Sequence, residues 1–485
     1  MNQPIRRIAT LTCLMFLALL ISVTMVQFVR APELVADGRN SRTIYEEYGR
    51  ERGPIIVADQ SIVTSEPVDN LYSFQRTYNQ GELYAHATGY FSVAFNSMTG
   101  VERAENGVLG GSDQSLALQR IKDLITGNSQ RGGGVELTLD PEIQQAAVDA
   151  LAGQKGAIVV LEPDTGRILA MVSVPSYDPN LLATHDSAAA QENYDALVAD
   201  PDQPLLNRAT GGELYTPGSV YKVVTATAML ENGYSMDERI EAPTEYVPAG
   251  TTHAIHNPGE LACGDGSGEA TLLESLRQSC NTPFAIASVD LGEDVMREQA
   301  EKFGFGQDLS IPLTVRPSQF PDTQGEAELA QVGFGQSELR TSPLQMAMVA
   351  SAIANDGSLM QPYLVERTLT SDLDEVSTTS PKEFSRAMSE DTADALTEMM
   401  VEVVANGTGY RAQIQGVDVA GKTGTAEISS TIPPHAWFIG FAPADNPEVA
   451  IAVMVENGGN QGFGTDGGSL AAPMAQSVML TALND

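Results

Sequence analysis

An uninterrupted apolar run near the N-terminus is the first feature of the chain. Residues 8–29 hold no charged side chain, and as a helix they would extend about 33 Å, enough to cross the core of a bilayer. Arg6 and Arg7 precede the run, and a basic flank favours the cytoplasmic side. A cleaved signal peptide is the alternative, but its apolar run would be shorter and would end in a small-residue cleavage site. We therefore expect a cytoplasmic tail over 1–7 and a transmembrane anchor over 8–29 in the cell membrane, with everything after Arg30 outside it.

Hydrophobic periodicity is weak over residues 30–134, which are rich in Gly, Asn, Tyr and charged side chains. Residues 53–58 form a short strand-like run, and residues 116–126 have a helical pattern. Residues 127–134 include three consecutive glycines and are typical of a linker. No catalytic cluster lies here, so we expect a small non-catalytic pedestal, a spacer or interaction domain.

Strand and helix patterns over residues 135–485 predict one α+β domain. A run of strand type opens it, and Asp140-Pro141 then provides the cap and first residue of a helix reaching about residue 151. The middle of the domain, roughly 207–400, is mostly helical, and its polar segment 364–386 predicts an exposed loop with a strand or two. Strands at both ends imply a sheet assembled from both ends, with the active site where sheet and helical insertion meet. The predicted strands and last helix are 156–162, 167–173, 416–428, 435–442, 448–455 and 469–483.

Composition narrows the possible partners. The net charge is -36 and the isoelectric point is near 4.3, which argues against nucleic acid or an anionic membrane surface as the main partner, because both require a basic patch. The chain has only six lysines. Two of them, Lys222 and Lys422, fall in motifs that carry chemistry, and their scarcity makes those positions informative.

Cysteine usage is consistent with an exported protein. Cys13 lies in the apolar run, so Cys263 and Cys280 are the only pair in the outer region. Thiols in an oxidising compartment can be bridged. We hypothesise a Cys263 to Cys280 disulfide, whose loop would contribute roughly 3 kcal/mol in the chain-entropy description.

The first chemical motif is Ser219-x-x-Lys222. A helix is predicted from 219 to 232, where Gly233 provides the stop, and its positions are apolar or small nearly all the way round. Ser219 and Lys222 share one face of it. Burial lowers the pKa of a lysine, so Lys222 could accept the proton of the Ser219 hydroxyl. A serine three residues before a lysine is nevertheless common, and the pair alone does not establish catalysis.

Two further motifs follow, each weak by itself. Ser279-Cys280-Asn281 lies in a tight connection between predicted helices 271–277 and 282–291, where a serine could relay a proton and an asparagine could bind a substrate amide. A helix-capping pair is the simpler interpretation. Lys422-Thr423-Gly424-Thr425 lies in a predicted strand, on which Lys422 and Gly424 point one way and the two threonines the other. Such a strand could accept an extended peptide and hold its carboxylate, or be an ordinary strand with a glycine bulge.

The order of the three motifs carries more weight than any one of them. Ser-x-x-Lys, Ser-x-Asn and Lys-Thr-Gly each occur in the structural context that their chemistry requires. With this order the chain resembles the penicillin-binding proteins and serine β-lactamases over about 135–485. The anchor and short pedestal are similar to class B, monofunctional members, and the cysteine within Ser279-Cys280-Asn281 is most similar to the actinobacterial penicillin-binding protein A group. Further segments that look like this family are 52–55, 100–106, 207–211, 341–347, 353–357 and 435–443.

The resemblance implies a five-stranded antiparallel sheet flanked by helices and a serine D,D-transpeptidase that crosslinks peptidoglycan stem peptides. Ser219 would be the nucleophile, Lys222 its base and Ser279 a proton relay. The backbone N–H groups of Ser219 and Thr425 would form the oxyanion hole.

The substrate-binding residues implied by the resemblance are Asn281, Lys422, Thr423, Gly424 and Thr425. β-Lactam antibiotics would acylate Ser219. No cofactor or metal is expected, because the only pair with ligand-like spacing, His253 and His256, lies beside Pro258 and Gly259 in a predicted loop.

Several rival functions share these motifs. A D,D-carboxypeptidase would pass the acyl group to water, and motifs do not separate the two. The anchor and pedestal weigh against a secreted serine β-lactamase, and a membrane-anchored serine β-lactamase stays an alternative. A non-enzymatic β-lactam sensor would need a cytoplasmic signalling part, for which seven residues are too few. About 100 residues before 135 are also too few for a glycosyltransferase domain, so a polytopic glycan polymerase is the plausible partner by resemblance.

Overall fold

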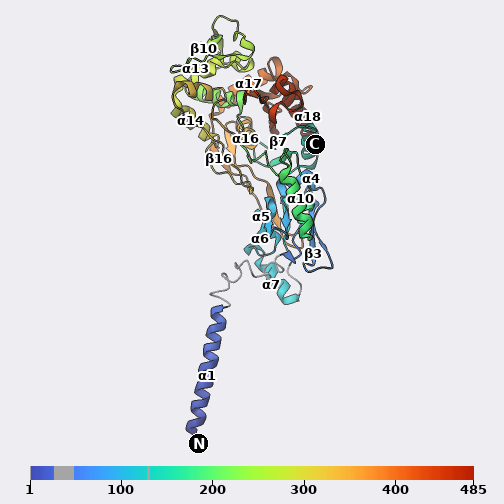
Figure 1. The fold of residues 1–485 in the computed structure, drawn as a ribbon. Helices are drawn as coiled ribbons and strands as arrows, with labels where there is room; N and C mark the ends of the chain where they lie inside the picture. The colour runs from blue at the N-terminus through green and yellow to red at the C-terminus, as the bar shows by residue number, and fades with distance from the viewer. Residues whose placement is uncertain (1, 27–47, 128–130, 485) are drawn as a thin grey trace.

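The computed structural model describes residues 2–26, 48–127 and 131–484 (Figure 1). Helix α1 (Asn2–Thr24) is long and apolar enough to cross a membrane, and its apolar side chains are exposed. Cys13 on this helix is a free thiol. The predicted anchor continues to residue 29, and its positions 27–29 lie outside the described residues, as do the first residues of the predicted pedestal, 30–47.

Five antiparallel strands form the central sheet in the order β17-β18-β19-β7-β8. Strands from both ends of the domain are therefore neighbours, as predicted: Ala452 of β19 lies opposite Val159 of β7. Nearly every residue of the sheet is buried, and this explains the continuous apolar runs in the sequence. The strands are β7 (Gly156–Leu161), β8 (Ile168–Val174), β17 (Ala420–Ala426), β18 (His435–Ala442) and β19 (Val449–Val455).

Helices cover both faces of the central sheet. On one face lie α8 (Pro141–Ala150) and α18 (Ala472–Ala482), which share a hydrophobic cluster with the sheet. α8 begins as predicted, because Asp140 accepts hydrogen bonds from the first-turn amides and Pro141 follows it. On the other face lies α16 (Pro343–Ala354), every residue of which is buried.

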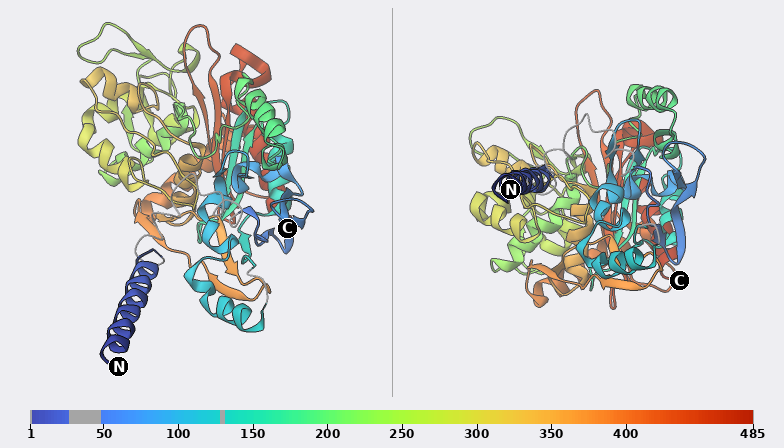
Figure 2. Two further views of the ribbon diagram at one scale, coloured as in Figure 1. Left: turned by 60° about the horizontal axis from the view of Figure 1, so that its bottom comes forward. Right: turned by 90° about the horizontal axis from the view of Figure 1, so that it is seen from below.

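The helical insertion lies beside the sheet, as the left view of Figure 2 shows. Its core packs against the face of the sheet that α16 covers. The insertion also holds three two-stranded pairings, which the sequence pattern did not separate from loops. Its helices and 3₁₀ turns are η3 (Gly218–Tyr221), α11 (Lys222–Glu231), η4 (Pro258–Glu260), α12 (Leu272–Arg277), α13 (Thr282–Leu291), α14 (Glu293–Lys302), α15 (Glu326–Val332), α17 (Glu390–Asn406) and η5 (Tyr410–Ala412). Its strands are β9 (Arg239–Glu241), β10 (Glu245–Tyr246), β11 (Ile255–His256), β12 (Glu269–Thr271), β13 (Ser358–Met360) and β16 (Glu383–Arg386).

A second, six-stranded sheet forms the pedestal, in the order β15-β14-β6-β1-β2-β3. It crosses the predicted domain boundary at 134/135, because β6 pairs in parallel with β1. It also contains β14 and β15, which lie in the segment predicted to be an exposed loop with a strand or two. The strands are present, but β14 is an inner strand of this sheet rather than part of a loop. The strands are β1 (Ile55–Val57), β2 (Gln60–Pro67), β3 (Phe74–Tyr78), β6 (Val135–Leu137), β14 (Val365–Leu369) and β15 (Glu375–Thr378).

Buried charges lie at the centre of the pedestal. The carboxylate of Glu102, which is fully buried, accepts hydrogen bonds from Arg52 at 2.7 Å and Arg76 at 2.6 Å. Burial opposes ionisation of Glu102, but the two guanidinium groups outweigh it and hold the pKa of Glu102 below its usual range. The remaining helices and strands are α4 (Gly81–Thr88), β4 (Phe91–Ser92), β5 (Ser97–Met98), α5 (Gly100–Ala104), α6 (Asn106–Leu109), η2 (Gln114–Leu116), α7 (Ala117–Thr126), α9 (Asn180–Ala183) and α10 (Ser187–Ala199).

The predicted linker over 127–134 is only partly correct. Residues 128–130 lie outside the described residues, but Gly132 and Gly133 are packed into the pedestal. A Cβ on Gly132 would lie 1.8 Å from the carbonyl oxygen of Leu109, so no larger side chain fits there. These glycines serve close packing of backbones rather than flexibility.

Candidate active site

Ser219 lies in the 3₁₀ turn η3, directly before α11. The sequence predicted a single helix from 219 to 232, whereas the structure begins with this tighter turn, a common start for a helix. Gly218 adopts a φ of +57°, and a Cβ there would lie 2.7 Å from the carbonyl oxygen of Thr425. Only glycine therefore allows the turn to approach β17 so closely. The half-buried Ser219 faces a cleft beside this contact.

Lys222 begins α11 and is completely buried. Its Nζ lies 2.7 Å from the carbonyl oxygen of Ser279, 2.7 Å from Oδ1 of Asn281 and 3.3 Å from Oγ of Ser279. Burial, and then the positive charge of Lys422, lower the pKa of Lys222 well below its usual value. The first and second motifs are thus in direct contact.

Lys422 on β17 reaches the same serine. Its Nζ donates to Oγ of Ser279 at 2.8 Å and to the carbonyl oxygen of Thr423 at 2.9 Å. Burial lowers the pKa of Lys422 to about 7. Ser279 therefore bridges two buried lysines, and it joins all three motifs in one hydrogen-bonded chain.

The turn 279–281 connects α12 to α13, as predicted. Ser279 has a φ of +58°, so the turn depends on its surroundings to hold this residue in a left-handed conformation. Oδ1 of Asn257 accepts hydrogen bonds from the amides of Asn281 at 2.8 Å and Thr282 at 3.0 Å. Asn281 in turn donates to the carbonyl oxygen of His256 at 2.7 Å.

Asn257 was not predicted as a site residue. It follows the β10–β11 hairpin, which holds His256 and was expected to be a loop. Its contacts cross more than twenty residues of sequence, and no local pattern signals them. The hairpin forms one wall of the cleft. Among the residues that the structure describes, no group of three or more His, Cys, Asp or Glu could hold a metal ion.

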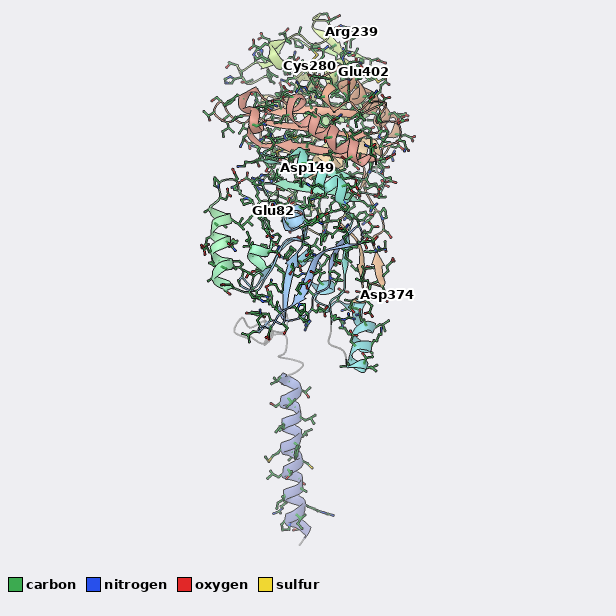
Figure 3. The ribbon with its side chains drawn as sticks, turned by 90° about the vertical axis from the view of Figure 1, so that its right-hand side faces the viewer. Glu82, Asp149, Arg239, Cys280, Asp374 and Glu402 are labelled. Carbon is green, nitrogen blue, oxygen red and sulfur yellow. A yellow bond between two sulfur atoms is a disulfide. The ribbon has the colours of Figure 1, made fainter. Side chains whose placement is uncertain are left out.

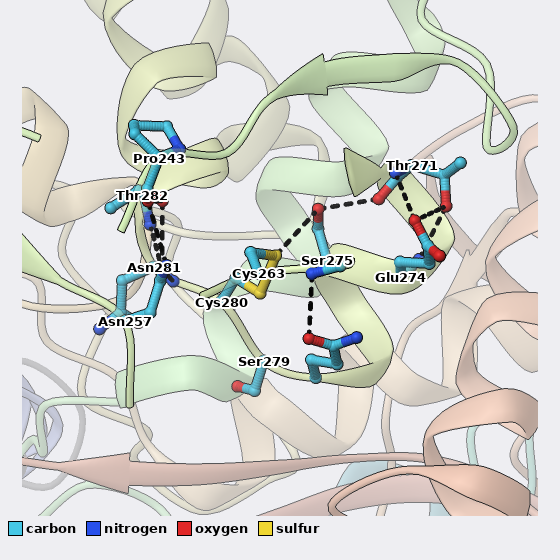
Figure 4. The surroundings of a disulfide bond; sticks show 12 residues. Pro243, Asn257, Cys263, Thr271, Glu274, Ser275, Ser279, Cys280, Asn281 and Thr282 are labelled. Carbon is cyan, nitrogen blue, oxygen red and sulfur yellow. Dashed lines mark hydrogen bonds between the residues drawn. A yellow bond between two sulfur atoms is a disulfide. The ribbon is translucent and has the colours of Figure 1, made fainter. Parts of the chain in front are cut away.

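The structure contains the predicted disulfide between Cys263 and Cys280, with Cα atoms 6.0 Å apart (Figure 4). Both cysteines are buried and pack with Ala242 and Ala270. Because Cys280 directly follows Ser279, the disulfide attaches the turn 279–281 to the neighbouring loop that holds Cys263.

The cleft has a volume of about 1070 Å³. Of the eight predicted catalytic and substrate-binding residues, six line it and the two lysines lie buried beneath it. Thr408, which the sequence did not indicate, also lines the cleft and shares a 2.6 Å hydrogen bond with Thr423. The lining residues from the three motifs are Ser219, Ser279, Asn281, Thr423, Gly424 and Thr425.

Four features surround one cleft: the turn with Ser219, the buried Lys222, the turn 279–281 and the edge strand β17 with its Lys-Thr-Gly sequence. This arrangement is that of a serine acyl-transfer site on a penicillin-recognising fold. Residues 156–480 match the penicillin binding protein transpeptidase domain, and residues 52–135 match the penicillin binding protein A dimerisation domain. The chain therefore belongs to the class B penicillin-binding proteins, the family of peptidoglycan D,D-transpeptidases.

Relatives support this placement over the whole length. The chain is 42% identical to the peptidoglycan D,D-transpeptidase PbpA of Mycolicibacterium smegmatis, over all of both sequences. It superposes with a TM-score of 0.86 on penicillin-binding protein A of Mycobacterium tuberculosis in a ceftriaxone acyl-enzyme complex, at 41% identity, covering 90% of this chain and all of that one. A penicillin G acyl-enzyme of the same protein gives 0.84 at 41% identity, with the same coverage.

Proposed function

We propose that this chain crosslinks peptidoglycan stem peptides by acyl transfer through Ser219. The observation that carries the proposal is the hydrogen-bonded chain from Lys222 through Ser279 to Lys422, which lies beneath a cleft lined by Ser219. Relatives named peptidoglycan D,D-transpeptidase and captured as β-lactam acyl-enzymes support the same reaction.

The hydrogen bonds around Lys222 suit a neutral amine. A neutral amine has two N–H donors and one lone pair. Its two donors match the carbonyl oxygen of Ser279 and Oδ1 of Asn281, which leaves the lone pair to accept the Ser219 proton. Oγ of Ser279 accepts a hydrogen bond from Lys422, which acts as the cation. With Lys222 neutral and Lys422 charged, the two buried lysines carry one positive charge between them rather than two adjacent ones.

In the proposed reaction, Oγ of Ser219 attacks the carbonyl carbon between the two terminal D-alanines, and its proton passes to Lys222. The negative oxygen of the tetrahedral intermediate is held by the N–H groups of Ser219 and Thr425. The C–N bond then breaks, and Ser279 delivers a proton to the departing nitrogen. D-alanine leaves and an ester on Ser219 remains. The amine of a second stem peptide attacks this ester, releases Ser219 and closes the crosslink.

Edge strand β17 would hold the substrate. An extended peptide can align along it at Gly424, while Lys422, Thr423 and Thr425 attract the terminal carboxylate. Asn281 has a second side-chain N–H besides the one donated to His256, and this can bind the substrate amide.

Replacing Ser219 tests the assignment most directly. A fluorescent penicillin, whose strained ring imitates the D-Ala-D-Ala bond, should label the wild type covalently and not Ser219→Ala. Ser337 lines the same cleft, so Ser337→Ala is the matched control and should label normally. Equal labelling of Ser219→Ala and wild type would refute the nucleophile.

Product analysis separates transfer from hydrolysis. A pentapeptide substrate should yield a crosslinked product when an acceptor amine is present. If tetrapeptide alone accumulates with the acceptor in excess, the chain is a carboxypeptidase instead.

For location we propose a single-pass membrane protein with its catalytic domain on the outer side, working beside a polytopic glycan polymerase. The apolar helix α1 supports an anchor, and a crosslinking enzyme requires newly polymerised glycan nearby. Co-purification of such a polymerase with the full chain from gently solubilised membranes is expected, and its consistent absence would count against the partnership.

A further inference from the structure

Helix α7 of the pedestal presents its apolar face to solvent. Leu118, Leu124 and Ile125 are 83%, 82% and 80% exposed, and Ile121 is 55% exposed. At helical spacing these four side chains form one stripe, about a third of the helix circumference. A surface helix of a soluble domain normally packs such a stripe against the protein core, whereas α7 exposes its stripe to solvent.

The polar face of α7 is the one attached to the protein. Gln119 exchanges two hydrogen bonds with Ser371 in the β14–β15 turn. Nζ of Lys122 lies 3.6 Å from the carboxylate of Asp372 in the same turn. Arg120 donates to the carbonyl oxygen of Asp113 at 2.7 Å. The helix is therefore fixed from its polar side, and the outward direction of its leucines and isoleucines follows from these bonds.

Two contacts place α7 where the chain arrives from the anchor. Arg50 donates to the carbonyl oxygen of Gly110, just before the segment that carries α7, and the amide of Gly132, just after it, donates to the carbonyl oxygen of Glu51. In Figure 1, α7 lies at the opposite end of the folded body from β10, whose hairpin borders the cleft. Figure 3 shows it next to the labelled Asp374, with side chains projecting outward.

We propose that the apolar face of α7 inserts into the outer surface of the lipid bilayer that α1 crosses. This inference rests on the membrane anchor of the proposed function. The stripe is flanked by Lys122 and Arg120, the arrangement of helices that lie in a membrane interface. In a chain with 27 basic and 63 acidic residues, the segment 117–131 holds three basic residues against one acidic one. The segment that carries α7 is thus a local basic region in an acidic chain.

A lipid surface fits this stripe better than a second protein does. Four side chains on one ten-residue helix offer much less area than the roughly 800 Å² per partner of a stable protein interface. Insertion into a bilayer needs no complementary groove. With α7 and α1 both engaged, the pedestal would be held at a defined tilt, with the cleft directed away from the membrane.

Depth-dependent quenching tests the proposal on the full-length chain. A Cys13→Ser background carries a single environment-sensitive fluorophore at Leu124→Cys, or at Val247→Cys as the matched control, since Val247 is also exposed and apolar but follows β10. The proteins are placed in vesicles of equal parts phosphatidylcholine and phosphatidylglycerol, with or without brominated acyl chains. Co-flotation with the vesicles reports the anchor, and fluorescent penicillin labelling reports the folded active site.

Bromolipid should quench the label at position 124 at least about twofold and leave position 247 unchanged. Adding Leu118→Ser and Ile125→Ser should abolish the quenching while penicillin labelling stays at the wild-type level. Absence of quenching at 124 in protein that floats and binds penicillin would overturn the proposal. The proposal would also be overturned, in favour of a protein partner, if the fluorophore at position 124 were shielded from water only in native membranes and bromolipid did not quench it. Failure to float would refute the anchor instead.

Discussion

At the scale of single residues, the proposed reaction requires two lysines in different charge states. In that reaction Lys222 accepts the Ser219 proton and must be neutral, whereas Lys422 attracts a carboxylate and must be charged. Burial lowers the pKa of both groups, and the charge of Lys422 lowers that of Lys222 further. This additional effect on Lys222 favours Lys222 as the neutral base and Lys422 as the cation, without any acidic partner.

A neutral Lys222 and a charged Lys422 together predict a pH optimum for acylation by penicillin. On the acidic side, protonation of Lys222 removes the base. On the alkaline side, Lys422 loses its proton above a pKa of about 7, so the second-order acylation rate should fall by about tenfold per pH unit beyond it. Stopped-flow measurement with a fluorescent penicillin from pH 5 to 9 should give a bell-shaped profile.

A penicillin that lacks its carboxylate tests whether Lys422 causes the fall of the acylation rate at high pH. A penicillin methyl ester has no carboxylate, so its acylation should be slower but should not decline above pH 7. A profile for the free acid that stays flat to pH 9 would show that the charge of Lys422 does not govern binding.

At the scale of elements, the turn 279–281 depends on a residue far from it in sequence. Asn257 is buried and accepts hydrogen bonds from two amides of the turn. Asn257→Ala should leave both amides unsatisfied and cost about 1–3 kcal/mol of stability. Because Ser279 would move away from Lys222 and Lys422, the acylation rate of the folded protein should fall by about tenfold or more.

Two readouts distinguish positioning from stability in this variant. Thermal unfolding measures the loss of stability, and the acylation rate per folded molecule measures the geometry of the turn. Asn193→Ala is the control, since Asn193 is a half-buried residue of α10, far from the cleft in sequence, and its side chain donates to the carbonyl oxygen of Leu181. A normal acylation rate in Asn257→Ala, whatever its melting temperature, would show that Asn257 does not position Ser279.

The elements differ in how well the sequence predicted them. The strand 435–442 and the helix 282–291 were predicted to the residue, because each is a continuous apolar run with a clear stop. The segment 364–386 was predicted to be an exposed loop with a strand or two, but the bounds of β14 and β15 could not be predicted, because their side chains are mostly half-exposed or exposed and show no period-two burial. The three motifs identified six of the cleft-lining residues, but Asn257 and Thr408 required the tertiary structure, since their partners are distant along the chain.

At the scale of the whole molecule, pedestal and catalytic domain are not separable pieces. β6 directly precedes the helix α8 that covers the central sheet, yet it pairs with β1 of the pedestal and with β14 from the catalytic side. A protein cut to residues 135–485 lacks β1, so the edge of β6 that pairs with β1 would be exposed. An unpaired edge of this kind is a template for association with other chains.

We therefore expect two truncated proteins to behave differently. The protein 48–485 keeps the six-stranded sheet and should be monodisperse and react with fluorescent penicillin at the wild-type rate. The protein 135–485 should aggregate or melt at least several degrees lower, because β6 loses its pairing with β1 and the sheet loses the burial that residues before 135 supply. Size-exclusion chromatography and thermal unfolding make the comparison, with penicillin labelling as the measure of active sites. If 135–485 were monomeric and equally stable, the shared sheet would be a contact between independent domains rather than part of one folding unit.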